Sequence, residues 1–156
     1  MAVKKVAGPR RYFPKDKWKK KDLQNHILIT GNNAFCLSLA EQLVKEKKPV
    51  TILCTDVSML QNIENNSYLR IIQSDQINTD DLQDSIYPSS RVMAISDSDA
   101  ENILVALMAR KKFNNENVFI TLKDPEFRIL LEDQDITVLT TDNVAEITEM
   151  LFPENK

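Results

Sequence analysis

Short apolar runs alternate with longer amphipathic stretches from Asp22 to the end of the chain. The apolar runs are rich in β-branched residues and predict strands that are buried on both faces. They cover residues 26–30, 50–55, 69–72, 92–96, 118–122 and 136–139. Strands that alternate with helices are typical of a parallel sheet covered on both faces. We therefore predict one α/β domain with a doubly wound parallel sheet of about six strands.

The stretches between these runs have the spacing of helices. Residues 34–47 place their apolar side chains mostly on one side, and residues 100–113 follow a capping box made by Ser98 and Glu101. Shorter helices are expected at 58–65, 79–85, 125–133 and 143–152. Asp124 followed by Pro125 marks a helix start, because the acid can cap the helix and proline is favourable at its first position.

The first strand–helix–strand unit, residues 26–56, is laid out like the opening unit of a nucleotide-binding fold. The three positions that hold glycine in a dinucleotide site are Gly31, Asn33 and Cys36 here. We expect Asn33 to keep the turn by adopting a positive φ, with its side chain projecting toward the pyrophosphate space. We expect Cys36 to thicken the contact between helix and strand. Gly8 is the only other glycine, so this pattern permits nucleotide binding without requiring it.

Basic residues concentrate at the start of the chain. Residues 1–21 hold nine of the 20 basic residues and one of the 23 acidic ones, so this segment carries +8 and the remainder −11, within a formal total of −3. Tyr12, Phe13 and Trp18 lie between these charges. Such a segment suits an anionic membrane surface or, on charge alone, nucleic acid. A solubilising tail or a linker is an equally good interpretation.

These patterns predict three segments. They are a basic arm or linker at 1–22, the α/β domain at 23–152 and a tail at 153–156. The apolar runs are shorter than the roughly 20 residues that span a bilayer, and no secretory signal opens the chain. We therefore expect a cytoplasmic location.

Histidine and cysteine give little indication of catalysis. Cys36 and Cys54 could lie close together in a parallel sheet, but a packing role is favoured over a redox role. His26, the only histidine, stands at a strand entrance, where a packed or surface residue is commoner than a general base. No segment remains for a substrate domain, so an oxidoreductase is disfavoured and no catalytic residue is predicted.

Four short segments together resemble a known family. They are residues 26–36, Ser-Asp-Gln at 74–76, Ala-Ile-Ser-Asp-Ser-Asp-Ala-Glu-Asn-Ile-Leu at 94–104 and Lys-Asp-Pro-Glu-Phe at 123–127. In this order and spacing, the chain resembles a regulator of potassium conductance domain, also called the Trk-type N-terminal domain, over residues 25–152. The resemblance implies a Rossmann-like domain that assembles as dimers or rings. It also implies a domain that gates a membrane potassium channel or transporter from its cytoplasmic side.

The resemblance also implies a ligand crevice. The candidate cofactor-binding residues are Gly31, Asn33, Asp56, Asp75, Ser96 and Asp97. In family members that bind adenine nucleotides or NAD, an acid ends the second strand, whereas this chain has Cys54 there. Asp56 matches a second, less essential acid, and Asp75 matches an acid near the adenine. Asp75 and Asp97 could equally serve ordinary strand-to-helix turns.

Metal binding is not predicted. Ile95 and Leu122 stand where calcium-gated relatives place two acidic ligands. The acid clusters at 80–84, 97–101 and 132–135 lack the spaced loop of a calcium site. We expect these acids to be solvated or to stabilise helix N-termini.

In the family, subunits pair through helices around strands five and six. The candidate interface residues, about half of which we expect to be core, are Phe119, Phe127, Ile129, Leu130, Met150, Leu151 and Phe152.

We therefore predict a regulatory domain of a potassium channel or transporter with weak or absent nucleotide binding. The cofactor is unknown, with an adenine nucleotide or NAD as the candidates. One alternative is a subunit that senses adenine nucleotides or NAD. A second alternative, a nucleic-acid-associated protein, depends on the arm alone and is disfavoured by the acidic remainder. The arm residues expected to contact lipid or pore are Arg10, Arg11, Lys19, Lys20 and Lys21.

Overall fold

The computed structural model describes residues 10–12, 25–56, 67–75, 77–83, 85–86 and 90–153, of which 10–12 are described through their backbone. The helix predicted at 58–65 and most of the basic arm, including Lys19, Lys20 and Lys21, lie outside these residues.

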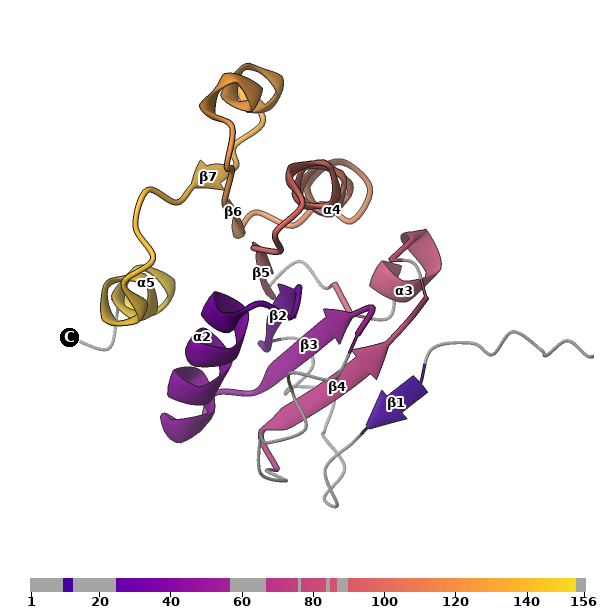
Figure 1. The fold of residues 1–156 in the computed structure, drawn as a ribbon, viewed down its shortest axis with the longest axis vertical. Helices are drawn as coiled ribbons and strands as arrows, with labels where there is room; N and C mark the ends of the chain where they lie inside the picture. Colours follow the sequence, from indigo (N-terminus) through magenta and orange to yellow (C-terminus); the bar gives the residue numbers. More distant parts are fainter. Residues whose placement is uncertain are drawn as a thin grey trace, which may run out of the picture.

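Seven strands form one sheet with the order β1-β4-β3-β2-β5-β6-β7 (Figure 1). They are β1 (Arg10–Tyr12), β2 (Ile27–Thr30), β3 (Val50–Cys54), β4 (Leu69–Gln73), β5 (Arg91–Ala94), β6 (Val118–Ile120) and β7 (Thr137–Val138). Strands β2 to β7 are parallel, which confirms the six predicted strands and the doubly wound order. The chain builds outward from β2 in one direction and then from β5 in the other. The switch point therefore lies between β2 and β5, where ligands bind in folds of this kind.

Strand β1 was not predicted. Arg10, Arg11 and Tyr12 pair antiparallel with Gln73, Ile72 and Ile71 at the edge of the sheet. These residues were expected to belong to the basic arm or linker, because three residues are too few to show a strand period.

Among the described residues, five helical segments connect and cover the strands. They are α2 (Ala34–Lys45), α3 (Thr79–Gln83), α4 (Asp99–Lys111), the 3₁₀ helix η2 (Pro125–Leu131) and α5 (Val144–Leu151). Two predicted N-caps are confirmed: Ser98 Oγ accepts a hydrogen bond from the Glu101 backbone N–H at 3.1 Å, and Asp124 Oδ1 accepts one from Glu126 at 2.9 Å. Within the described residues, none of these helices has the length and apolarity needed to cross a bilayer.

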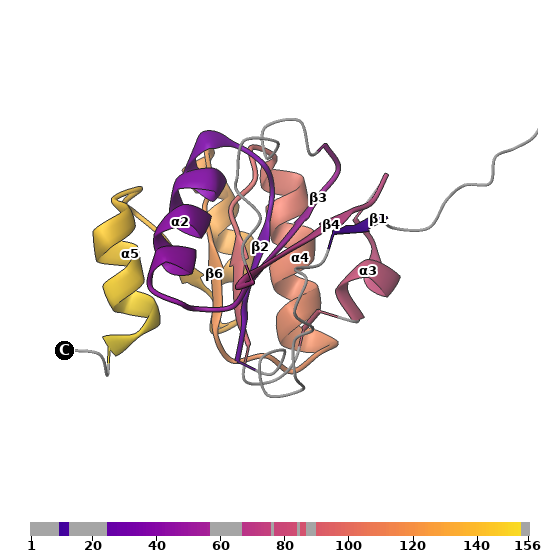
Figure 2. The ribbon, with the colours of Figure 1, turned by 90° about the horizontal axis from the view of Figure 1, so that it is seen from below.

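The sheet is the middle layer of three. Helices α2 and α5 lie on one face and α3 and α4 on the other (Figure 2). Side chains of β2 alternate between the layers, since Ile27 and Ile29 join the core under α2 and α5 while Leu28 joins the core under α4. Burial on both faces explains why most residues of the central strands are apolar.

The amino ends of the central strands are closed by buried polar groups. His26 is fully buried, and its Nε2 donates to the Ser85 carbonyl at 2.7 Å. Burial, with a smaller contribution from the charge of Arg70, lowers the pKa of His26 to about 4. Of the two roles predicted for His26, packed or surface, the structure shows the packed one.

The C-terminal end of α5 is fixed at the same side of the sheet. Arg91 Nε donates to the Leu151 carbonyl at 2.6 Å, and the Arg91 guanidinium lies 4.4 Å from the centre of the Phe152 ring. Lys48 Nζ lies 4.3 Å from the same ring centre. Leu151 and Phe152 are therefore core residues rather than an exposed surface.

Candidate functional site

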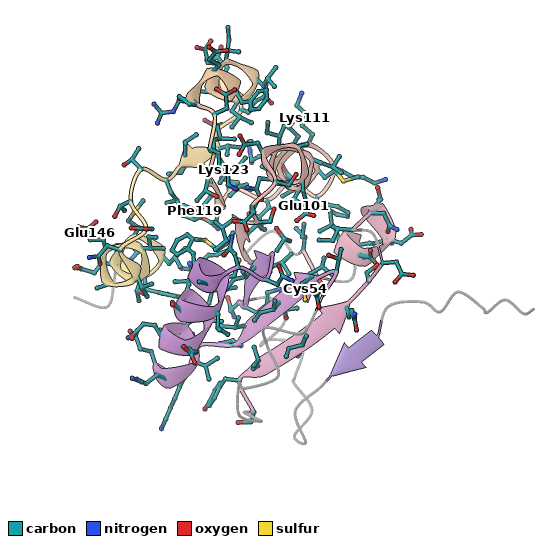
Figure 3. All side chains as sticks on the ribbon, in the orientation of Figure 1. Cys54, Glu101, Lys111, Phe119, Lys123 and Glu146 are labelled. Atoms are coloured by element: carbon teal, nitrogen blue, oxygen red, sulfur yellow. The ribbon has the colours of Figure 1, made fainter. Side chains whose placement is uncertain are left out.

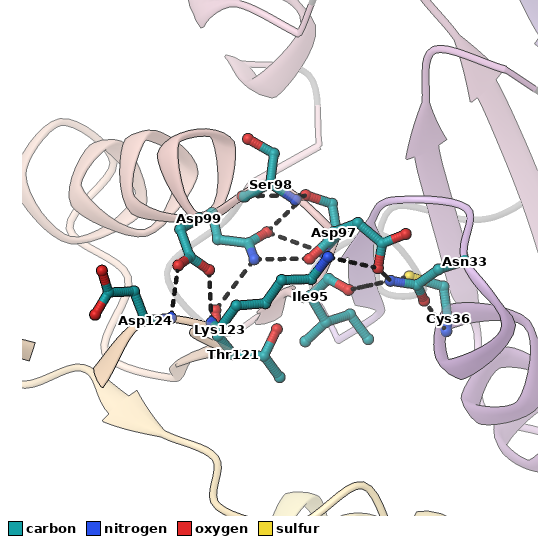
Figure 4. Close-up of polar contacts among 11 residues, drawn as sticks. Asn33, Cys36, Ile95, Asp97, Ser98, Asp99, Thr121, Lys123 and Asp124 are labelled. Atoms are coloured by element: carbon teal, nitrogen blue, oxygen red, sulfur yellow. Dashed lines mark hydrogen bonds and ion pairs between the residues drawn. The ribbon is translucent and has the colours of Figure 1, made fainter. Parts of the chain in front are cut away.

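The candidate crevice lies at the carboxyl ends of the central strands. The loop after β2 meets the loop after β5 there, and the loop after β6 lies next to them (Figure 4). Figure 3 shows Cys54 at the end of β3 and Glu101 on the first turn of α4. The end of β3 and the loops after β2, β5 and β6 therefore lie at the same edge of the sheet.

Gly31 makes the tight turn after β2. Its φ is +128°, and a Cβ atom placed on it would lie 2.8 Å from Ser96 Cα and 2.9 Å from Cys36 Sγ. Only glycine fits both this backbone conformation and this close approach. The prediction that Asn33 adopts a positive φ is wrong, because Asn33 is extended with φ −79° and Gly31 alone supplies the turn.

The Asn33 side chain bridges two loops. Its Oδ1 accepts a hydrogen bond from the Cys36 backbone N–H at 2.8 Å and so caps α2. Its Nδ2 donates to the Ile95 carbonyl at 3.0 Å and to Asp97 Oδ1 at 2.9 Å (Figure 4). Free backbone N–H groups at a helix N-terminus are what a bound phosphate uses. In this structure the Cys36 N–H is already paired with the chain's own amide.

The two cysteines are buried and free. Cys36 Sγ lies 3.5 Å from the Ile95 carbonyl, beneath the Asn33 bridge. Burial raises the pKa of Cys36 to about 12 and that of Cys54 to about 11. Both thiols therefore stay protonated near neutral pH, which supports packing over redox chemistry.

The candidate ribose- and adenine-binding acids lie further out. Cys54 ends β3 as a buried residue, whereas Asp56 is exposed and its backbone carbonyl accepts from Asn32 Nδ2 at 2.6 Å. Asp75 is exposed after β4, which stands two strands from β2 in the sheet. The structure thus brings Gly31, Asn33 and the loop after β5 together. Asp56 contacts the loop after β2 through its backbone, whereas Asp75 lies two strands away from β2.

Asn102 organises the loop after β5, and sequence reasoning missed it. Its Oδ1 accepts from the Ser96 N–H at 2.8 Å and from Ser96 Oγ at 3.0 Å. Its Nδ2 donates to the Ser96 carbonyl at 2.9 Å and to the Thr121 carbonyl at 3.1 Å. The available signal was an amide on the buried face of α4, in line with Val105, Ala106 and Ala109.

Asp99 joins the neighbouring loop. Its two carboxylate oxygens accept the backbone N–H groups of Lys123 at 2.7 Å and Asp124 at 2.9 Å. Lys123 Nζ lies 4.0 Å from Asp97 Oδ1, but both side chains are largely exposed, so this ion pair contributes little energy. Within the described residues, no group of three or more acidic, histidine or cysteine side chains is arranged to hold a metal ion.

Four of the seven candidate interface residues are exposed. Phe127, Ile129 and Leu130 lie on η2 with exposed fractions of 37%, 68% and 53%, and Met150 on α5 is 43% exposed. We call Phe127, Ile129 and Leu130 the η2 surface. Phe119 is partly buried and packs against the core. Leu151 and Phe152 are buried within the core.

Comparison with known proteins identifies a family. The TrkA-N domain model matches residues 27–142. "Potassium channel protein 1" of Methanocaldococcus jannaschii is 30% identical over 118 residues, which cover 73% of this chain and 35% of that protein. "Trk system potassium uptake protein TrkA" of Haemophilus influenzae is 25% identical over 130 residues, which cover 83% of this chain and 27% of that protein.

Solved structures share the fold. The GsuK RCK domain superposes with a TM-score of 0.61 at 17% identity, over 83% of this chain and 28% of that one. The NAD(P)-binding domain of an exopolyphosphatase-related protein from Archaeoglobus fulgidus superposes with a TM-score of 0.59 at 15% identity, over 85% of this chain and 99% of that one.

The chain spans about a third or less of the length of the two potassium-transport relatives. The family model covers most of the α/β domain described above, from the first residue of β2 to the loop that follows β7. This chain therefore belongs to the TrkA-N domain family.

Proposed function

We propose that this domain regulates a potassium channel or transporter from the cytoplasmic side of the membrane, without a tightly bound nucleotide. The observation that carries the potassium assignment is membership of the TrkA-N family, with sequence relatives described as a potassium channel protein and a potassium uptake protein. A regulatory rather than enzymatic role also fits the burial of His26, Cys36 and Cys54, which removes the imidazole and both thiols from solvent.

The geometry of the crevice supports weak or absent nucleotide binding. The Cys36 N–H is paired with Asn33 Oδ1, and the Asn33 amide is held by Ile95 and Asp97. A pyrophosphate would have to displace these hydrogen bonds and approach the exposed carboxylate of Asp97, which repels it. The end of β3 offers a buried thiol, Cys54, where a ribose would need an acceptor.

Assembly with further copies is the second part of the proposal. The η2 surface presents three large apolar side chains to solvent, and such a cluster is typical of a contact surface. A dimer or ring formed there would let one domain move relative to another. That motion could act on a pore only if the partner binds the two arrangements with different affinity.

A subunit that senses adenine nucleotides or NAD is the second candidate. Asp56 and Asp75 support it, because both carboxylates are exposed near the carboxyl ends of β3 and β4. In that case a ribose would contact the margin of the crevice while Asn33 moves aside. This candidate requires measurable nucleotide affinity, whereas the first does not.

Rubidium uptake tests the potassium assignment. In cells that encode this chain, deletion of the coding region for residues 1–156 should change the initial rate of ⁸⁶Rb⁺ uptake several-fold, and expression of the intact chain should restore it. An in-frame Ala145→Glu variant, altered at an exposed position of α5, is the control and should behave as wild type. Equal uptake with and without the chain at every external potassium concentration would refute the proposal.

A further inference from the structure

We propose that a continuous set of polar contacts couples Asn33 to the η2 surface, so that the state of the loop after β2 controls the position of η2. The contacts run from Asn33 through the loop after β5 and the loop after β6 to Asp124, the N-cap of η2 (Figure 4), and from there to Glu126 and Phe127. The coupling is a property of the isolated chain, and only its use in regulation depends on the proposed function.

The first step joins the loops after β2 and β5. Asn33 Nδ2 donates to the Ile95 carbonyl and to Asp97 Oδ1, at 3.0 and 2.9 Å. Gly31 packs against Ser96 so closely that a methyl group would not fit between them. A shift of Asn33 would therefore break its hydrogen bonds with Ile95 and Asp97.

The second step passes through the buried amide of Asn102. The Asn102 side chain accepts from the Ser96 N–H and donates to the Ser96 carbonyl. It also donates to the Thr121 carbonyl at the end of β6. Asn102 has no solvent exposure, so water cannot replace these hydrogen bonds without the loops moving together.

The third step reaches η2. Asp99 binds the backbone N–H groups of Lys123 and Asp124 with its two carboxylate oxygens. Asp124 then caps η2: its Oδ1 accepts from Glu126 at 2.9 Å, and its carbonyl accepts from Phe127 at 3.1 Å. Phe127 is the first residue of the η2 surface, so the contacts end where the exposed apolar side chains begin.

These contacts are all made by the chain's own side chains. Asn33 occupies the crevice and is linked, through Asn102 and Asp99, to the start of η2. A partner or ligand that drew the Asn33 amide away from Asp97 would release the loop after β5. The same event would change the η2 surface, which lies roughly 90 residues further along the chain.

Amide hydrogen exchange measured by NMR on the full chain tests the coupling. Asn33→Asp keeps the oxygen that caps α2 but removes both Nδ2 hydrogen bonds and places a second carboxylate beside Asp97. Exchange of the Thr121, Lys123, Asp124 and Phe127 amides should accelerate by roughly threefold or more, while the Cys36 amide keeps its protection. Asn33→Ser is the second variant: it also keeps a cap acceptor, lacks the donor and adds no charge.

The matched control is Asn143→Asp. Asn143 caps α5 by accepting from the Glu146 N–H at 3.0 Å, so the same substitution is made at the N-cap of another helix on the same face of the sheet as α2. It should leave exchange at residues 121–127 unchanged. A double-mutant cycle of Asn33→Asp with Asp99→Asn should give a combined acceleration at Phe127 clearly smaller than the product of the two single effects.

Two results would overturn the coupling. One is exchange at residues 121–127 that stays at the wild-type rate in both folded Asn33 variants. The other is a double variant in which the acceleration of Phe127 exchange equals the product of the accelerations in the two single variants. Neither result depends on potassium transport, so the coupling and the proposed function can fail separately: unchanged ⁸⁶Rb⁺ uptake with intact coupling would refute only the function.

Discussion

At the residue scale, Asn33 has the largest influence on the candidate site. One side chain caps α2 and ties the loop after β2 to the loop after β5. Next to it, a side chain at position 31 would clash with Ser96 and with the Cys36 thiol. The crevice is therefore filled by the chain's own polar groups at the position where a pyrophosphate would need backbone donors.

His26 provides a prediction about pH. Its pKa is about 4 in the folded chain and about 6.5 in the unfolded chain, so the unfolded state takes up a proton first as pH falls. The contribution of neutral His26 to stability should be complete above pH 6.5 and should be lost progressively from pH 6.5 to 4, by roughly 3 kcal/mol at most.

The measurement is urea unfolding of wild type and His26→Gln between pH 4 and 7.5. Other groups titrate in both proteins, so the difference between their pH slopes isolates His26. The account expects a shallower slope in the variant between pH 6.5 and 4. Identical slopes would contradict the burial of a neutral imidazole at the strand entrance.

The sequence predicted which loops form the candidate site, but not the conformation of every residue in them. The sequence correctly placed Gly31, Asn33, Ser96 and Asp97 in neighbouring loops, because the carboxyl ends of β2 and β5 meet in a doubly wound sheet. It assigned positive φ to Asn33 rather than to Gly31 alone. That error arose because an asparagine before a helix can either turn the backbone or cap the helix, and tertiary contacts with Ile95 and Asp97 decide between them.

At the element scale, the loops after β5 and β6 behave as one polar unit built on α4. Ser98 caps that helix, Asn102 holds Ser96 and Thr121, and Asp99 holds the start of η2. The caps at Ser98 and Asp124 were predictable, since capping depends on local spacing. The role of Asn102 was not, because its partners lie in other elements.

Removal of the Asn102 amide should destabilise the domain. Asn102→Ala leaves the Ser96 N–H and the Thr121 carbonyl without their partner, which should lower the free energy of unfolding by roughly 1–3 kcal/mol. Leu104→Ala on the exposed face of the same helix is the control and should stay within about 0.5 kcal/mol of wild type. Denaturant unfolding compares them, and equal stabilities of the two variants would count against a structural role for the amide.

At the scale of the whole molecule, the chain is a three-layer parallel domain with an added antiparallel edge. The order of β2 to β7 was predictable from the alternation of apolar runs and amphipathic helices. Strand β1 was not, because three residues inside a basic segment show no periodicity and its pairing with β4 is a long-range contact. The exposure of the η2 surface could not be predicted from the sequence either, because its side chains are as apolar as those of the core.

The η2 surface carries a prediction about assembly. Ile129 is 68% exposed, so Ile129→Glu should leave the domain folded while weakening self-association by about tenfold or more, because a charge would be buried in an apolar contact. Ala145→Glu adds the same charge on α5 and serves as the control. Sedimentation equilibrium over a range of concentrations compares them. If all three proteins have the same mass distribution, the η2 surface is not where copies meet.

We infer that this domain works through its shape and contacts, with its crevice occupied by its own side chains. Isothermal titration calorimetry of the full chain with ATP, ADP, NAD and NADH tests it most directly. The account predicts no binding tighter than about 1 mM, which corresponds to roughly −4 kcal/mol. Micromolar binding of any of these nucleotides to the wild-type chain, weakened at least tenfold by Asp75→Ala, would contradict it.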